Sequence, residues 1–223
     1  MALIKTELEI ERIRNSSLLV GKTIAEVARH IKPGVTTLAL DKIAEEFIRD
    51  HKAKPAFKGY HGYPATLCIS VNEIVVHGIP GKRELKEGDL VSIDCGTVID
   101  GYYGDSAFSF GIAPMVTEVE LLMQRTHQSL LKSIASVTAG KRVGDIGYEV
   151  QTYVESFGYS VVRDLVGHGL GNSLHEKPEV PNYGRRGTGP KLEAGMVICI
   201  EPMINLGTRQ VMQENDGWTI RTM

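Results

Sequence analysis

Residues 90–110 read LVSIDCGTVIDGYYGDSAFSF, and this stretch predicts a β-hairpin. Asp100-Gly101 is a strong signal for a two-residue turn between two strands. With these two residues at the centre of the turn, Asp94 and Asp105 become diagonal neighbours on one face, about 7–8 Å apart at Cα. A turn of another length would break this parity, so the carboxylate pair depends on the turn.

A carboxylate pair in this setting favours a bound cation. Asp94 lies in an apolar run, where an unpaired carboxylate is costly or takes up a proton. For one aspartate alone, a hydrogen-bonded turn is the simpler interpretation. Two carboxylates that converge from adjacent strands are better explained by a metal ion.

The rest of the chain predicts helices and strands in two similar halves. Apolar spacings of three and four predict helices over residues 6–31, 38–50 and 117–137, with a fourth ending near residue 157. Runs rich in β-branched residues predict strands over residues 68–71, 74–77, 90–99, 160–166 and 196–200. When Gly34 is aligned with Gly140, the apolar positions of the second and fourth helices coincide. We therefore expect two α+β halves of similar plan, fused into a single domain over residues 1–223.

The second half carries another set of side chains with metal-binding chemistry. His168 lies between glycines in Gly167–Gly171, and Glu201 ends an apolar run. A single histidine in such a place is more often a hydrogen-bonded core residue. Together with Asp94 and Asp105, however, His168 and Glu201 form an oxygen and imidazole donor set typical of Mn²⁺, Fe²⁺, Co²⁺ or Zn²⁺. Paired ions of this kind support hydrolysis. His77 and His175 belong to neither strand-end carboxylate group, so they are assigned to the substrate, as donors to the scissile amide or to the oxyanion.

Composition excludes several classes of protein. The formal net charge is −2 with mixed signs, which argues against nucleic acid as the primary ligand. No apolar run reaches the roughly 20 residues of a membrane helix, and the charged N-terminal sequence is unlike a signal peptide, so we expect a cytoplasmic protein. The three cysteines, Cys68, Cys95 and Cys199, form no CxxC motif, which argues against disulfides and a thiolate zinc site.

Several motifs together resemble type I methionine aminopeptidase over essentially the whole chain. They are HGIP at 77–80, IDCGTVIDGYYGD at 93–105, GHGLG at 167–171, HEKPEVPNYG at 175–184, IEPMI at 200–204 and DGWT at 216–219. The resemblance implies the pita-bread fold, in which two pseudo-symmetric halves form a curved antiparallel sheet covered by two helix pairs. It also implies a monomeric enzyme that removes the initiator methionine from nascent peptides with a small second residue. It leaves docking on the ribosome open.

The resemblance also implies roles for individual residues. Two divalent ions (Co, Mn, Fe or Zn) are held by Asp94, Asp105, His168 and Glu201, with Asp105 bridging. Glu201 carries a proton to the leaving amine, while His77 and His175 contact the substrate and support the tetrahedral intermediate. The methionine side chain enters a pocket formed by Tyr60, Tyr63, Cys68, His77 and Trp218. Without the resemblance, plain core packing explains the pocket aromatics equally well.

Two alternatives concern the activity of the chain. Family members carry a second bridging glutamate beyond the DGWT motif, whereas this sequence ends at Met223. From this we expect a weakened second ion and poor or absent activity. A peptide-binding module of the same fold without catalysis is the alternative. Proline-directed peptidases of this fold are a third interpretation, but they carry an added N-terminal domain.

Overall fold

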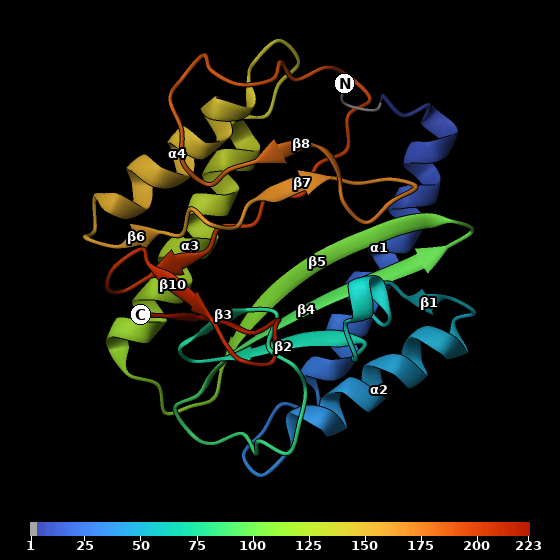
Figure 1. Cartoon of the computed structure of the whole chain (residues 1–223), viewed down its shortest axis with the longest axis vertical. Coiled ribbons are helices and arrows are strands. Elements are labelled where there is room, and N and C mark those ends of the chain that lie inside the picture. Colours follow the sequence, from blue (N-terminus) through green and yellow to red (C-terminus); the bar gives the residue numbers. More distant parts are fainter. Residues whose placement is uncertain (1–3) are drawn as a thin grey trace. The chain divides into compact units, whose positions relative to one another are not determined.

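The computed structural model of the chain describes residues 4–223 (Figure 1). These residues divide into two compact units, each of which mixes helices and strands. The first unit comprises Glu11–Val119 and Met212–Arg221. The second comprises Glu120–Val211, Thr222–Met223 and the described residues before Glu11. The expectation of a single domain over residues 1–223 stays a prediction.

The first unit is built around an antiparallel sheet covered by two helices. Strand β4 (Leu90–Ile99) pairs with β5 (Tyr102–Gly111), with β2 (Leu67–Val71) and with the short β1 (Lys54–Pro55). A smaller sheet has the order β10-β11-β3, formed by β10 (Val211–Gln213), β11 (Ile220–Thr222) and β3 (Ile74–Val76). The helices are α1 (Glu7–Ala28), apart from its residues before Glu11, and α2 (Thr37–Asp50), and a 3₁₀ turn covers Tyr60–Gly62.

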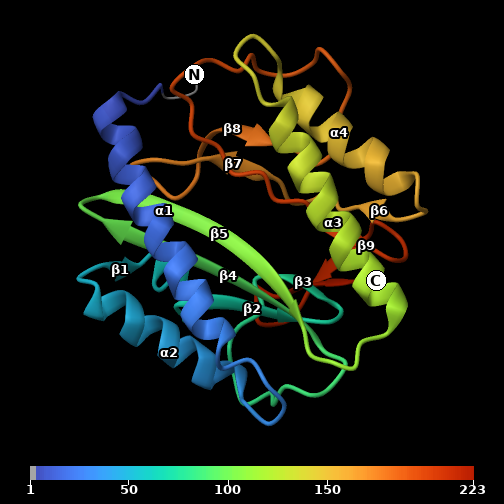
Figure 2. The same cartoon turned by 180° about the vertical axis from the view of Figure 1, so that it is seen from behind.

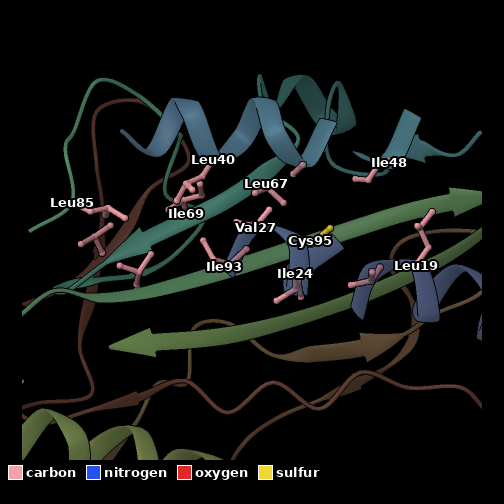
Figure 3. Close-up of a cluster of buried hydrophobic side chains, with 14 of the residues drawn as sticks. Leu19, Ile24, Val27, Leu40, Ile48, Leu67, Ile69, Leu85, Ile93 and Cys95 are labelled. Atoms are coloured by element: carbon pink, nitrogen blue, oxygen red, sulfur yellow. The ribbon is translucent and has the colours of Figure 1, made fainter. Parts of the chain in front are cut away.

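The core of the first unit joins both helices to the sheet (Figure 3). The fully buried side chains of α2 follow the helical period, as Leu40, Ala44 and Ile48 do. They pack in one cluster with Leu67 and Ile93 of the strands and with apolar residues of α1. The period of the sequence therefore fixes which face of each helix is buried.

Helix α1 also approaches the hairpin closely (Figure 2). The Ser16 hydroxyl donates to the carbonyl of Thr97 at 2.9 Å. A Cβ on Gly104 would lie 2.4 Å from the backbone nitrogen of Ser17, so only glycine fits there. These contacts fix the hairpin against α1.

The hairpin has the predicted turn and register. Asp100 and Gly101 have φ values of 50° and 80°, as the central residues of a type I′ turn require. Asp94 lies opposite Ala107, and Asp105 lies opposite Gly96. Asp94 and Asp105 are therefore diagonal neighbours, and this prediction from the sequence is confirmed.

The second unit contains the other predicted helix pair, α3 (Thr117–Ser136) and α4 (Val143–Glu155), apart from the first residues of α3. Its strands are short and pair antiparallel in twos: β6 (Ser160–Val161) with β9 (Ile204–Asn205), and β7 (Gly167–Gly169) with β8 (Glu176–Val180). Among the described residues, no helix is long and apolar enough to cross a membrane.

Two strand predictions in this unit are wrong in extent. The strand expected over 160–166 is only β6, and 196–200 is an extended segment with one isolated bridge between Ile198 and Gly169. The segment still lies beside β7, because the Cys199 amide donates to the His168 carbonyl at 2.7 Å. A register shift between His168 and Gly169 interrupts the ladder of β7 with β8. A bulge of this kind prevents a long regular strand at this position.

The two helix pairs share local structure. The buried Leu40, Ala44 and Ile48 of α2 correspond to the buried Ile146, Val150 and Val154 of α4. The amide of Gly34 donates to the Leu85 carbonyl at 2.8 Å, and the amide of Gly140 donates to the Leu192 carbonyl at 2.9 Å. The predicted similarity of the two halves is therefore present in backbone hydrogen bonds as well as in apolar pattern.

Candidate metal centre and substrate site

The first unit supplies the two aspartates from adjacent strands. Asp94 of β4 and Asp105 of β5 are both half-buried. Cys68 of β2 lies directly opposite Asp94 in the register. Burial first, and then the charge of Asp94, raise the pKa of the Cys68 thiol well above its usual range. Cys68 is therefore a neutral thiol, suited to lining a pocket and unsuited to act as a nucleophile.

The second unit brings His168 and Glu201 into contact. The His168 Nδ1 lies 2.9 Å from the carbonyl oxygen of Gly169, which can only accept, so Nδ1 carries a proton. The His168 Nε2 lies 3.2 Å from Glu201 Oε1. Within residues 4–223, this buried Oε1 has no hydrogen-bond partner. In neutral His168 two acceptor atoms thus face each other, an arrangement that a bound cation would relieve.

This arrangement fits a divalent metal. Histidine ligands of metals commonly donate the second ring N–H to a backbone carbonyl, as His168 does to Gly169. A carboxylate oxygen that is buried without a donor is costly unless a cation binds it. Both donor types suit the first-row divalent ions named above.

Sequence reasoning missed Cys199 as a neighbour of this group. The sulfur of Cys199 and a ring nitrogen of His168 lie within 4.8 Å of each other. Cys199 is two residues before Glu201, and side chains at this spacing in an extended segment share a face. That spacing was the available signal. The partner across the segment could not be read from the sequence, because the bridge to β7 is isolated and irregular.

The two histidines expected to contact the substrate lie in different surroundings. His175 is exposed, and its ring stands edge-on to that of His168 with centroids 4.3 Å apart. His77 follows β3 with a positive φ of 59°, a conformation that a non-glycine residue rarely adopts. Its ring is 6.4 Å from that of Trp218. Strained backbone of this kind is frequent at functional sites.

The predicted pocket residues of the first unit are partly brought together. Tyr63 and Trp218 make an edge-to-face contact with ring centroids 5.1 Å apart. The Tyr63 hydroxyl donates to the carbonyls of Leu67 and Gly78, and burial raises its pKa, so it stays protonated. The ring of Tyr60 packs edge-on against His61.

The loop before Trp218 holds the indole in place. Asp216 accepts hydrogen bonds from the amides of Trp218 and Thr219, both at 2.8 Å, and from the Thr219 hydroxyl at 2.6 Å. Burial acts to raise the pKa of Asp216, but these hydrogen bonds outweigh it and lower the pKa overall. Trp218 therefore stands on an ordered turn.

Comparisons with known proteins agree with this chemistry. Residues 11–222 match the model of metallopeptidase family M24. Methionine aminopeptidase from Clostridium perfringens is 50% identical over 222 residues, covering 100% of this chain and 89% of the relative. The crystal structures of methionine aminopeptidase from Rickettsia prowazekii and Thermotoga maritima both superpose with a TM-score of 0.98, at 41% and 43% identity, over 100% of this chain and 90% of theirs.

These matches confirm the expected pita-bread fold and the resemblance stated from the motifs. They extend over nearly the whole of the chain and about nine tenths of each relative. The chain therefore belongs to metallopeptidase family M24, among its methionine aminopeptidases.

Proposed function

We propose that this protein is a metal-dependent hydrolase that removes the N-terminal methionine from peptides with a small second residue. Full-length similarity to methionine aminopeptidases supports the reaction. The observation in this chain that carries the proposal is the buried Glu201 Oε1, which faces His168 Nε2 at 3.2 Å and has no hydrogen-bond donor among residues 4–223.

The family uses divalent metal ions, and four residues of this chain are proposed to hold two of them. They are Asp94, Asp105, His168 and Glu201. The diagonal placement of the aspartates and the tautomer of His168 support this assignment. When bound, ions of this class supply a water-derived nucleophile and polarise the scissile carbonyl. Cobalt, manganese, iron and zinc all suit the donor set.

The remaining roles fall to the chain's own side chains. Glu201 carries a proton from the attacking water to the leaving amine, which requires a carboxylate at the reacting atoms. His77 and His175 donate hydrogen bonds to the peptide and to the oxyanion that develops on it. Tyr60, Tyr63, Cys68 and Trp218, with His77, surround the methionine side chain. Aromatic and thiol groups suit a thioether, because sulfur–aromatic contacts contribute about 0.3–1.5 kcal/mol each.

Residues 1–223 would then act as one catalytic domain, which the family match over residues 11–222 supports. The proposed partners are nascent peptides that begin with methionine. A monomeric protein in the cytoplasm is the setting that the balanced charge and the similarity to methionine aminopeptidases favour. Ribosome association would bring such an enzyme close to its substrates.

Calorimetric metal titration combined with an assay of Met-Ala-Ser hydrolysis tests the proposal. We expect saturable binding of divalent ions and release of methionine that a chelator abolishes. A matched peptide with leucine in second position should be cleaved much more slowly. Metal-independent hydrolysis, or binding of methionyl peptides without cleavage when metal is loaded, would show that the protein is not this enzyme.

A further inference from the structure

A buried ion pair lies in the second unit, and the reaction described above does not use it. The Lys5 Nζ is 2.6 Å from Glu176 Oε2, and the two side chains are only 4% and 7% exposed. The pair joins residues 171 positions apart in the sequence. Lys5 comes just before α1, and Glu176 opens β8 directly after His175.

Both residues of the ion pair make further hydrogen bonds to backbone groups nearby. The backbone N–H of Lys5 donates to the carbonyl of Gly195 at 2.8 Å. The second oxygen of Glu176, Oε1, accepts the amide of Ser173 at 3.1 Å. The amide of Gly171 in turn donates to the Ser173 carbonyl at 3.2 Å. The ion pair thus connects the segment before α1 with the loop over residues 171–175.

Two glycines leave room for the lysine side chain and its backbone. A Cβ added to Gly171 would lie 2.3 Å from Lys5 Nζ and 2.9 Å from Glu176 Oε1. A Cβ added to Gly195 would lie 2.9 Å from the carbonyl oxygen of Lys5. Because any larger residue would displace the lysine, the loop backbone is shaped around the buried ammonium group.

Stability alone is a weak reason for such a pair. Burial removes both charges from water, and buried ion pairs often contribute no more than apolar residues of the same size. What a buried pair does provide is a single geometry, because loss of either partner leaves an uncompensated charge. Here that geometry fixes the backbone next to His175, whose own side chain is exposed and is not held by burial.

We propose that Lys5 is a positioning residue for His175, acting through the Glu176 carboxylate and the 171–175 loop. The proposal deepens the proposed function and rests on the role of His175 in substrate contact. Lys5 itself touches no reacting group. Its effect on catalysis would come from holding the donor of His175 at the position where the oxyanion develops, since misplacement by about 1 Å can cost about 100-fold in rate.

Amide hydrogen exchange tests, without any need for turnover, whether the Lys5–Glu176 ion pair (the anchor) holds the 171–175 loop. In Lys5→Met, the amides of Gly171 and Ser173 should exchange at least about tenfold faster, while those of α4 keep their protection. Exposed Lys191→Met is the matched control, with no change expected in either region. Glu176→Gln keeps the size of the side chain and should accelerate the same amides to a smaller degree. Unchanged exchange at Gly171 and Ser173 in both anchor variants would overturn the proposal.

A double-mutant cycle then links the anchor to His175. We expect Lys5→Met and His175→Ala each to lower kcat by about 10- to 100-fold with KM changed little. The double variant should be no slower than His175→Ala, because the anchor has nothing left to position. Losses that multiply, or a His175→Ala variant as active as the parent, would contradict the proposal. A metal-loaded parent that releases no methionine would instead count against the proposed function. The hydrogen-exchange result would still test whether Lys5 and Glu176 hold the 171–175 loop.

Discussion

Replacing Glu201 by glutamine should make the protein more stable than the parent without metal and less stable than the parent in the presence of metal. Glu201 Oε1 is buried, lacks a hydrogen-bond donor among the described residues, and faces His168 Nε2 at 3.2 Å. His168 Nδ1 already donates to Gly169, so Nε2 of the neutral ring offers only a lone pair. The amide of glutamine can donate to that lone pair, whereas the carboxylate cannot.

The size of the effect follows from this geometry. One new hydrogen bond at a buried, previously unsatisfied group contributes about 1 kcal/mol. For a chain of this length, 1 kcal/mol corresponds to about 2–4 °C in Tm. Metal acts in the opposite direction, because a ligand at a hundred times its Kd stabilises the parent by about 2.7 kcal/mol. A neutral amide at position 201 would lose most of that gain and, with it, hydrolysis.

Thermal unfolding in chelator and in excess Mn²⁺ or Co²⁺ measures both effects. Glu201→Gln should melt above the parent in chelator and below it in metal. Glu193→Gln removes an exposed carboxylate of the same unit and should stay within about 0.5 kcal/mol of the parent in both conditions. A Glu201→Gln variant that melts below the parent in chelator would refute the inference that Glu201 Oε1 and His168 Nε2 face each other as two acceptors. A Glu201→Gln variant that metal stabilises as much as it stabilises the parent would show that Glu201 is not a metal ligand.

Three further substitutions test other parts of the structure. Burial raises the pKa of Asp41 despite its hydrogen bonds from two amides, so the parent loses stability as pH rises through that raised pKa. Asp41→Asn should therefore become more stable relative to the parent as pH rises above the ordinary titration range of an aspartate, measured by urea unfolding. Asp216→Ala removes the acceptors that order Trp218 and should raise KM for Met-Ala-Ser about three- to tenfold with kcat unchanged. An unchanged KM would show that the indole does not line the methionine pocket. Gly167→Ala would place its Cβ 2.3 Å from the backbone oxygen of Cys199 and should cost about 3 kcal/mol, whereas Gly207→Ala, with nothing within 4 Å, should cost less than about 1 kcal/mol; equal urea midpoints would contradict this close approach.

Local signals account for the parts of the fold that the sequence predicted correctly. The turn at Asp100-Gly101 determines which residues face each other along the whole hairpin, so one dipeptide was enough to place Asp94 and Asp105. The helices were equally accessible because their buried faces repeat within a few residues. In both cases the decisive interactions lie close together in the chain.

The parts that sequence reasoning missed depend on distant partners. Residues 196–200 are apolar enough for a strand, but their pairing is decided by the bulge in β7. The position of Cys199 beside His168 follows from that same irregular pairing. The contact of Lys5 with Glu176 joins residues 171 positions apart, and neither residue carries a local pattern that predicts burial.

The repeated frame of the two halves explains why each contributes one carboxylate at the same structural place. Leu85, Gly88 and Asp94 correspond at one constant spacing to Leu192, Gly195 and Glu201, and both glycines have positive φ. Leu85 and Leu192 accept equivalent amides, from Gly34 and Gly140, so the backbone that leads to each carboxylate begins from the same hydrogen-bonded point. The halves differ in what faces that carboxylate, a neutral cysteine opposite Asp94 and an imidazole beside Glu201. The other two proposed ligands come from neighbouring strands, Asp105 from β5 beside Asp94 and His168 from β7 beside Glu201. The shared frame therefore accounts for one carboxylate in each half, and the donors that distinguish the halves come from the strand packed next to each carboxylate.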